Sequence, residues 1–297
     1  MTEINESKTQ SRVIWGIVFF DFILTLVKEN VSVTIAAGLT ILFFIFFTLA
    51  HGLHRLGAKD FWIFFAITFV VSWCYESLSI HTGFPFGHYY YTGTLGPKLG
   101  DVPLMIMPAY FGMGYTSWEI AHLLTDHLDR KLAGRDIVAV PAIAAFVMVM
   151  WDLSMDPISS TIQHGWIWQN GGGYFDVPLV NFLGWYLCVY TIFQLFAWYQ
   201  TRFSKESDLL KTENTREFWG QAIIFYILQA LGKIVALFSV KPGSVKDLAG
   251  ISWNIPDIYQ GLVVVITFTM GFIAVIATDR LYRLPLIKRS QLDQKTK

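Results

Sequence analysis

Three carboxylic acids lie in or just beyond long apolar stretches of this sequence. Glu76 falls in the run at 61–80, Asp152 falls near the end of the run at 136–155, and Asp156 directly follows that run. A spacing of four residues places Asp152 and Asp156 on one face of a helix. Carboxyl groups that share a dry cavity hold at least one proton at neutral pH, because burial and a neighbouring negative charge both oppose ionisation. A group that holds its proton in this way can act as a general acid.

Each acid also has a structural interpretation. A carboxylate in hydrocarbon is costly and therefore faces a cavity or a partner. At the depth of the membrane interface, the same acids would instead cap helices or bind loop amides. This alternative is strongest for Asp156, which precedes Pro157, where the helix is expected to end. Asp21, in the run at 13–27, is interpreted as a satisfied polar group in a helix contact.

The composition is that of an integral membrane protein. Of the 297 residues, 54% are hydrophobic and 15% are charged, whereas soluble domains carry about 25% charged residues. The mean hydropathy is +0.47. The formal net charge is zero, so we expect no nucleic-acid partner. Cys74 and Cys188 lie in apolar runs, which favours two buried thiols over a redox pair or a disulfide.

Apolar runs of about 20 residues predict transmembrane helices. The predicted fold class is all-α, a polytopic transmembrane helical bundle that forms one integral membrane domain over 1–297. The eight predicted spans are 13–27, 31–50, 61–80, 102–125, 136–155, 178–199, 219–239 and 258–278. Seven spans are the alternative, because the first run is short and resembles a cleaved signal peptide.

Positive charges predict the orientation of these helices. Most of the 22 Lys and Arg residues lie on the face that holds both termini and the loops 51–60, 126–135 and 200–218. The opposite face holds only Lys28, Lys98, Lys241 and Lys246. Because cytoplasmic loops are enriched in Lys and Arg, we expect a cell-membrane protein with cytoplasmic N- and C-termini. The polar tail at 280–297 is interpreted as a topology anchor.

Two loops on the outer face share a sequence pattern. Leu-Ser follows both Glu76 and Asp152, and each segment ends in Asp-Val-Pro-Leu, at 101–104 and 176–179. This pattern predicts that spans three and four recur as spans five and six in a parallel repeat, with loops that pair and cover one cavity. Each Asp is expected to start the following helix, with Pro close behind. Chance similarity between helix starts is the alternative.

Aromatic residues are dense around the acids and could line a slot for a flat apolar ligand. An aromatic belt at the membrane interface is their alternative role. The residues expected to bind substrate are Tyr75, Phe84, Phe86, Tyr89, Tyr90, Trp151, Tyr174 and Phe175. No nucleotide-binding motif is present, and His81, His88 and His164 lack the spacing of a metal site. We therefore expect neither a cofactor nor a metal.

Three segments carry a resemblance to a known family. They are HTGFPFGHYYYTGTLGPKLGDVPLMIMPAYF (81–111), WDLSMDP (151–157) and GGYFDVPLVNFLGW (172–185). They resemble the membrane carotenoid-biosynthesis family typified by bisanhydrobacterioruberin hydratase and γ-carotene hydratase, most strongly over 73–185. The resemblance implies a cofactor-independent hydratase of the hydro-lyase class. Such an enzyme adds water across the terminal C=C bond of an acyclic carotenoid, or another polyisoprenoid, within the lipid membrane.

In this chemistry a protonated carboxyl donates to the alkene, aromatic faces stabilise a tertiary carbocation, and a positioned water attacks. We expect Asp152 to be the acid, Asp156 or Glu76 to tune it or hold water, and His81 to orient an acid or a water. A carotenoid cyclase or isomerase, which uses the same carbocation, stays open. So does a non-catalytic protein that binds or transports a lipid or carotenoid, or that holds other carotenoid-pathway enzymes together.

Overall fold

Helices make up most of the part of the chain that the structure describes, where three pairs of short strands lie in the connections between them. This computed structural model describes residues 2–27, 32–129, 131–204 and 216–284. The helices are α1 (Thr2–Val27), α2 (Val33–Phe47), α3 (Leu53–Thr82), α4 (Ile106–Leu124), α5 (Asp136–Asp156), α6 (Leu179–Phe203), α7 (Arg216–Leu237), α8 (Ile255–Phe268) and α9 (Met270–Arg283), with π-helical turns η2 (Thr48–Gly52) and η3 (Pro157–Ile162). The strands are β1 (Tyr89–Tyr91), β2 (Lys98–Leu99), β3 (Val102–Pro103), β4 (Trp166–Trp168), β5 (Ser244–Lys246) and β6 (Ser252–Asn254).

Six helical segments among the described residues are long and apolar enough to cross a membrane. They are Lys8–Val27, Thr34–Thr82, Asp136–Ile162, Leu179–Phe203, Arg216–Leu237 and Ile255–Arg283. Helix α4, which carries Glu119 and His122, is not among them. The described helices overlap all eight predicted spans, but the number that cross the membrane stays a prediction. Lys28 and the tail beyond residue 284 lie outside the described residues.

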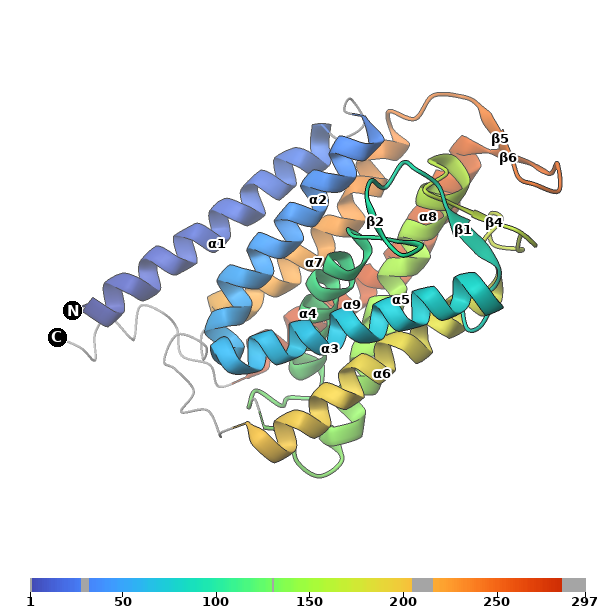
Figure 1. Cartoon of the computed structure of the whole chain (residues 1–297). Helices are drawn as coiled ribbons and strands as arrows, with labels where there is room; N and C mark the ends of the chain where they lie inside the picture. Colours follow the sequence, from blue (N-terminus) through green and yellow to red (C-terminus); the bar gives the residue numbers. More distant parts are fainter. Residues whose placement is uncertain (1, 28–31, 130, 205–215, 285–297) are drawn as a thin grey trace.

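The segment Thr34–Thr82 is 49 residues long but is not one straight helix. At 1.5 Å per residue such a helix would measure about 74 Å, more than twice the roughly 30 Å of a hydrocarbon core. Gly57 breaks it with φ 74° and ψ 158°, a conformation that glycine adopts without a Cβ clash. In Figure 1, α2 and α3 run in different directions on either side of this break. The predicted loop at 51–60 is therefore wrong, because the chain stays helical except at Gly57.

Helix α4 lies at the centre of the bundle. Every residue from Tyr110 to Leu123 is buried, and α4 packs against α2, α3, α5, α7 and α9. Gly112 allows α2 to approach closely, since a Cβ there would lie 2.5 Å from the Phe44 Cβ. Through these contacts α4 sets the positions of α3 and α5, which carry the three acids.

The strands gather at one end of the bundle, opposite the N-terminal end of α1 (Figure 1). β1 pairs with β4 in antiparallel register, and this joins the loop that follows α3 to the loop that follows η3. The two loops that were predicted to pair therefore do pair. Whether the two helical hairpins form a repeat stays a prediction.

Neither Asp of the two Asp-Val-Pro-Leu segments starts a helix, so that prediction is wrong. Helix α4 begins at Ile106 after an N-cap at Met105, and α6 begins after an N-cap at Pro178. Asp176 lies in a turn with φ 73°, and Asp101 lies between β2 and β3. Asp suits such positions because its side chain forms local turns and tolerates the left-handed region.

Gly184 lets α6 pack directly on the loop between α3 and β1. A Cβ at this position would lie 2.6 Å from the carbonyl oxygen of Pro85. We expect Gly184→Ala to destabilise the fold by about 1–3 kcal/mol, because overpacking forces the backbone to shift. Thermal unfolding in detergent measures the effect. Gly38→Ala is the matched control, since no atom of the described residues lies within 4 Å of its added Cβ; equal unfolding midpoints would contradict the prediction.

Candidate active site

Four aromatic side chains on the inner face of the β1–β4 ribbon cover a cavity. The register places Tyr89 opposite Trp168 and Tyr91 opposite Trp166. Successive strand residues point to opposite faces, so Tyr89 and Tyr91 are buried whereas Tyr90 is 44% exposed. The alternation within Tyr-Tyr-Tyr thus directs two phenols toward the helices.

Glu76, in the last two turns of α3, accepts hydrogen bonds from three phenols. Tyr91 donates to Oε2 at 2.9 Å, Tyr110 donates to Oε1 at 2.9 Å, and Tyr89 also donates to Oε2. Both oxygens thus act as acceptors, and the three bonds use three of the roughly four lone-pair sites of a carboxylate. Burial, together with the Glu76 carboxyl, raises the pKa of Tyr89 well above its ordinary value. Tyr89 is therefore a donor at neutral pH.

Asp152 and Asp156 lie one turn apart near the end of α5 and share one amide donor. Asn181 Nδ2, in the first turn of α6, donates to Asp152 Oδ2 at 3.5 Å and also to Asp156 Oδ2. The two acids are 0% and 1% exposed. Asp152 Oδ1 is buried with no hydrogen-bond partner among the described residues. One neutral donor therefore serves two buried carboxyl groups.

The α-helical pattern of α5 ends at Asp156, since Pro157 has no backbone N–H for the helical bond, but the backbone stays helical to Ile162 and the predicted break at Pro157 is wrong. The chain continues as the π-helical turn η3 rather than as a loop. In that turn the Ser160 hydroxyl donates to the Asp156 carbonyl at 2.8 Å. Single π-helical turns of this kind are frequent at functional sites.

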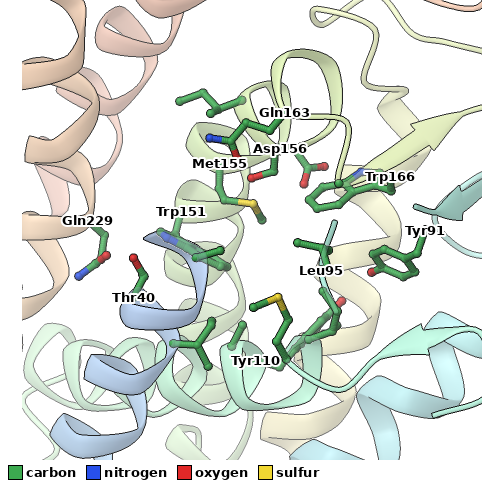
Figure 2. Close-up of a pocket in the computed structure, with 18 of the residues that line it drawn as sticks. Thr40, Tyr91, Leu95, Tyr110, Trp151, Met155, Asp156, Gln163, Trp166 and Gln229 are labelled. Atoms are coloured by element: carbon green, nitrogen blue, oxygen red, sulfur yellow. The ribbon is translucent and has the colours of Figure 1, made fainter. Parts of the chain in front are cut away.

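A cavity of about 290 Å³ lies beneath the ribbon, among helices α2 to α8. Glu76, Asp156 and Asn181 line it, whereas Asp152 does not. Its aromatic wall consists of Phe44, Phe86, Tyr89, Tyr91, Tyr110, Trp151, Trp166, Trp168, Trp185 and Tyr259. Figure 2 shows Trp151 and Asp156 on α5, with Tyr91 and Tyr110 on the other sides of the same space. The cavity thus combines two acids with ten aromatic side chains.

Five of the twelve predicted catalytic and substrate-binding residues line this cavity. They are Glu76, Asp156, Phe86, Tyr89 and Trp151. His81 lies elsewhere, because its side chain is 67% exposed and its Nε2 lies 3.4 Å from Asp101 Oδ2. Among the described residues, no group of three or more His, Cys, Asp or Glu is placed to hold a metal ion.

The other predicted aromatic residues do not line the cavity. Phe84 and Tyr90 point outward and are 57% and 44% exposed. Tyr75, Tyr174 and Phe175 are half-buried, and their respective partners are the Thr191 hydroxyl, the Leu153 carbonyl and the Trp253 ring. Residues that lie close to an acid in the sequence are therefore often not the ones that line the cavity with it.

The lining residues that the predicted set omitted include six that carry an aromatic ring or an amide. They are Tyr91, Tyr110, Trp166, Trp168, Asn181 and Trp185. The period-two alternation of a strand would have selected Tyr91 along with Tyr89. Asn181 is a polar residue inside a predicted span, which is itself a functional signal. Tyr110 and Trp185, whose rings stack with centroids 4.4 Å apart, carry no comparable signal.

The chain matches carotenoid biosynthesis proteins over residues 33–244. It belongs to the carotenoid biosynthesis protein family. This confirms the resemblance found in the sequence, and the matched segment contains every cavity-lining residue except Tyr259. Together with the long apolar helices, the family indicates a membrane protein with a role in carotenoid biosynthesis.

One relative gives a more specific comparison within the family. Bisanhydrobacterioruberin hydratase of Haloarcula japonica is 30% identical to the chain over 113 residues. That alignment covers 38% of this chain and 36% of the relative, so the chain matches little more than a third of the relative's length. No solved structure matches the chain.

Asp176 is a buried acid outside the membrane-spanning helices. Burial, and to a lesser degree Asp247, raises the pKa of Asp176 to about 6. This value lies above the unfolded pKa of about 4. The contribution of the protonated Asp176 carboxyl to the free energy of unfolding is therefore complete below pH 4 and is lost as the pH rises through about 6. We expect Asp176→Asn to raise the thermal midpoint at about pH 7.5 and to leave it unchanged near pH 4. A constant difference across this range would contradict the prediction.

Proposed function

We propose that this protein adds water across the terminal C=C bond of an acyclic carotenoid end. The observation that carries the proposal is a single cavity that combines buried acids with a wall of aromatic rings. Membership of the carotenoid biosynthesis family supports a carotenoid substrate. The partial match to a bisanhydrobacterioruberin hydratase supports hydration as the reaction.

The cavity is sized for one end of a carotenoid. Its volume of about 290 Å³ is at the lower limit of ligand pockets, which span roughly 300–1,000 Å³ for drug-sized molecules. A long polyene would therefore place one end among the acids and keep the rest of its length outside the cavity, in the bilayer. The reaction would act on one chain end at a time.

We assign the role of general acid to Asp156, with Asp152 as its partner. Asp156 lines the cavity and Asp152 does not, which reverses the roles expected from the sequence. Asn181 serves both carboxyl groups, and two neighbouring buried carboxylates repel each other, so the pair is suited to share one proton. His81, which faces away from the cavity beside Asp101, has no part in this proposal.

The remaining steps use the other lining residues. Asp156 gives its proton to the less substituted carbon of the terminal C=C bond and becomes a carboxylate, while the alkene electron pair forms the new C–H bond and leaves a tertiary cation on the carbon that bears the two methyl groups. The faces of Trp151, Trp166 and Trp185 stabilise this cation, at about 0.5–2 kcal/mol for each well-placed ring. Glu76 holds a water whose oxygen forms the C–O bond, and the proton released restores Asp156.

The proposal is tested in a host that makes lycopene or an acyclic C50 carotenoid. Expression of the protein should produce a pigment heavier by one water for each hydrated end, with earlier elution on a reversed-phase column. An unchanged pigment profile in both hosts, with the protein present in the membrane, would contradict hydration. A product of unchanged mass but altered retention would instead support the cyclase alternative.

We also propose that both termini face the cytoplasm, which places the β1–β4 ribbon on the outer side. The asymmetry of Lys and Arg between the two faces motivates this orientation. A C-terminal reporter that is active only outside the cytoplasm should be inactive. Activity of that reporter would overturn the orientation.

A further inference from the structure

The cavity has a second polar region, separate from Glu76 and Asp156. Thr40 on α2 and Gln229 and Lys233 on α7 also line it. In Figure 2, Gln229 and Thr40 lie to the left of Trp151, whereas Asp156 and Tyr91 lie to its right. We call this region, between α2 and α7, the polar arm of the cavity.

Small side chains leave space in the polar arm. Ala36 and Ala37 on α2, and Gly232 and Ala236 on α7, line it beside the polar residues. Spacings of three and four residues place each set on one face of its helix. Residues 36 and 37 lie near the start of α2, and residue 236 lies near the end of α7. The arm therefore extends toward the end of the bundle that carries the strands.

The polar groups of the arm are held in place by the protein. Gln229 Nε2 donates to Asp21 Oδ2 at 2.9 Å, and Lys233 Nζ donates to the Gln229 carbonyl at 2.6 Å. Gln229 and Lys233 are 7% and 8% exposed. Burying such groups inside a membrane protein is costly. An acyclic polyene end, which has only carbon and hydrogen, offers them no hydrogen bonds.

A hydrogen bond that joins two helices does not by itself require the side chains of Gln229 and Lys233 to face a cavity. Gln221, two turns earlier on α7, joins α7 to α1 by donating to the Ser11 hydroxyl at 3.2 Å. Gln221 is buried but does not line the cavity. The exposure of Gln229 and Lys233 to the cavity therefore distinguishes them from a purely structural contact of the same kind.

We infer that the polar arm binds water and conducts it to the acids. This inference rests on the proposed hydration. The reaction consumes one water in a site whose lining is mostly aromatic and aliphatic, so water needs polar partners along its path. Without water, the tertiary cation returns a proton from a neighbouring carbon to the Asp156 carboxylate and yields an alkene of unchanged mass.

Product partition tests the inference in the carotenoid-producing host. Gln229→Leu should lower the ratio of hydrated to unhydrated rearranged product by at least about five-fold, because an ordered water loses its partner. Gln221→Leu is the matched control, since it removes the α1–α7 hydrogen bond outside the cavity, and it should leave the ratio unchanged. An unchanged ratio in Gln229→Leu, or an equal fall in both variants, would overturn the inference.

Thiol labelling tests the same inference without relying on activity. In a Cys74→Ala, Cys188→Ala background, Ala37→Cys places a thiol in the arm, and Leu39→Cys places one on the exposed side of α2. Because the thiolate is the reactive form, a small charged methanethiosulfonate should label Ala37→Cys at least about ten times faster in membranes. Equal or slower labelling of Ala37→Cys would overturn the inference. This result does not depend on whether the pigments show hydration, so the two failures can be told apart.

Discussion

Replacing Asp156 with asparagine should abolish most of the conversion of an acyclic carotenoid to its hydrated product. A positioned general acid contributes roughly 10²–10⁴-fold to rate, and we expect a loss in this range. Asparagine keeps the size of the side chain and an oxygen that accepts from Asn181, so the variant should fold. Pigment yield, normalised to protein in the membrane, measures the effect.

The matched controls for this prediction are two other buried acids. Asp152→Asn should reduce conversion less than Asp156→Asn, because Asp152 does not line the cavity. Asp60→Asn should leave conversion near the wild-type value, since Asp60 binds Tyr199 and Ser204 and does not line the cavity. Wild-type conversion by Asp156→Asn would remove Asp156 from the acid role. A larger loss in Asp152→Asn would restore the roles expected from the sequence.

Glu76→Gln should also reduce conversion by about 10²-fold or more, and it should destabilise the fold. An amide offers one acceptor oxygen where Glu76 offers two. If that oxygen serves Tyr89 and Tyr91, the amide nitrogen faces the Tyr110 hydroxyl, whose proton then lacks its acceptor. A buried donor without an acceptor costs about 1–3 kcal/mol. Thermal and denaturant unfolding in detergent measure this loss.

A double-mutant cycle tests the reason for the effect. Because Tyr110→Phe removes the mismatched hydroxyl, Glu76→Gln/Tyr110→Phe should be no less stable than Glu76→Gln alone. Glu76→Gln/Tyr226→Phe is the control, since the Tyr226 hydroxyl donates to the Val147 carbonyl at 2.9 Å and does not contact Glu76. The loss of stability in this double variant should equal the sum of the losses in the two single variants. Additive effects in both cycles would show that Tyr110 and Glu76 are not coupled.

Local sequence features were enough to predict the helices. The apolar runs overlap α1 to α9. The predictions failed where packing competes with local signals. The chain stays helical through most of 51–60 because η2 packs inside the bundle. The packing there is close, since a Cβ on Gly52 would lie 3.2 Å from the Tyr115 ring.

The three candidate acids stand out in the sequence, but their surroundings do not. Glu76, Asp152 and Asp156 stand out because ionisable residues are rare in apolar runs. Their partners come from other elements: Tyr89 and Tyr91 from β1, Tyr110 from α4, and Asn181 from α6. The aromatic residues nearest the acids in sequence, such as Tyr75, were poor guides, because only one face of a helix meets the cavity.

The sequence by itself determined that this is a largely helical, carotenoid-family membrane chain with acids at the ends of two helices. Those properties depend on run lengths, residue types and short motifs, which are local. Only the tertiary structure decided that three phenols meet Glu76, that Asp156 rather than Asp152 reaches the cavity, and that a polar arm enters it between α2 and α7. These outcomes depend on how helices distant in sequence pack against α4, and hydropathy does not encode which side chains then meet.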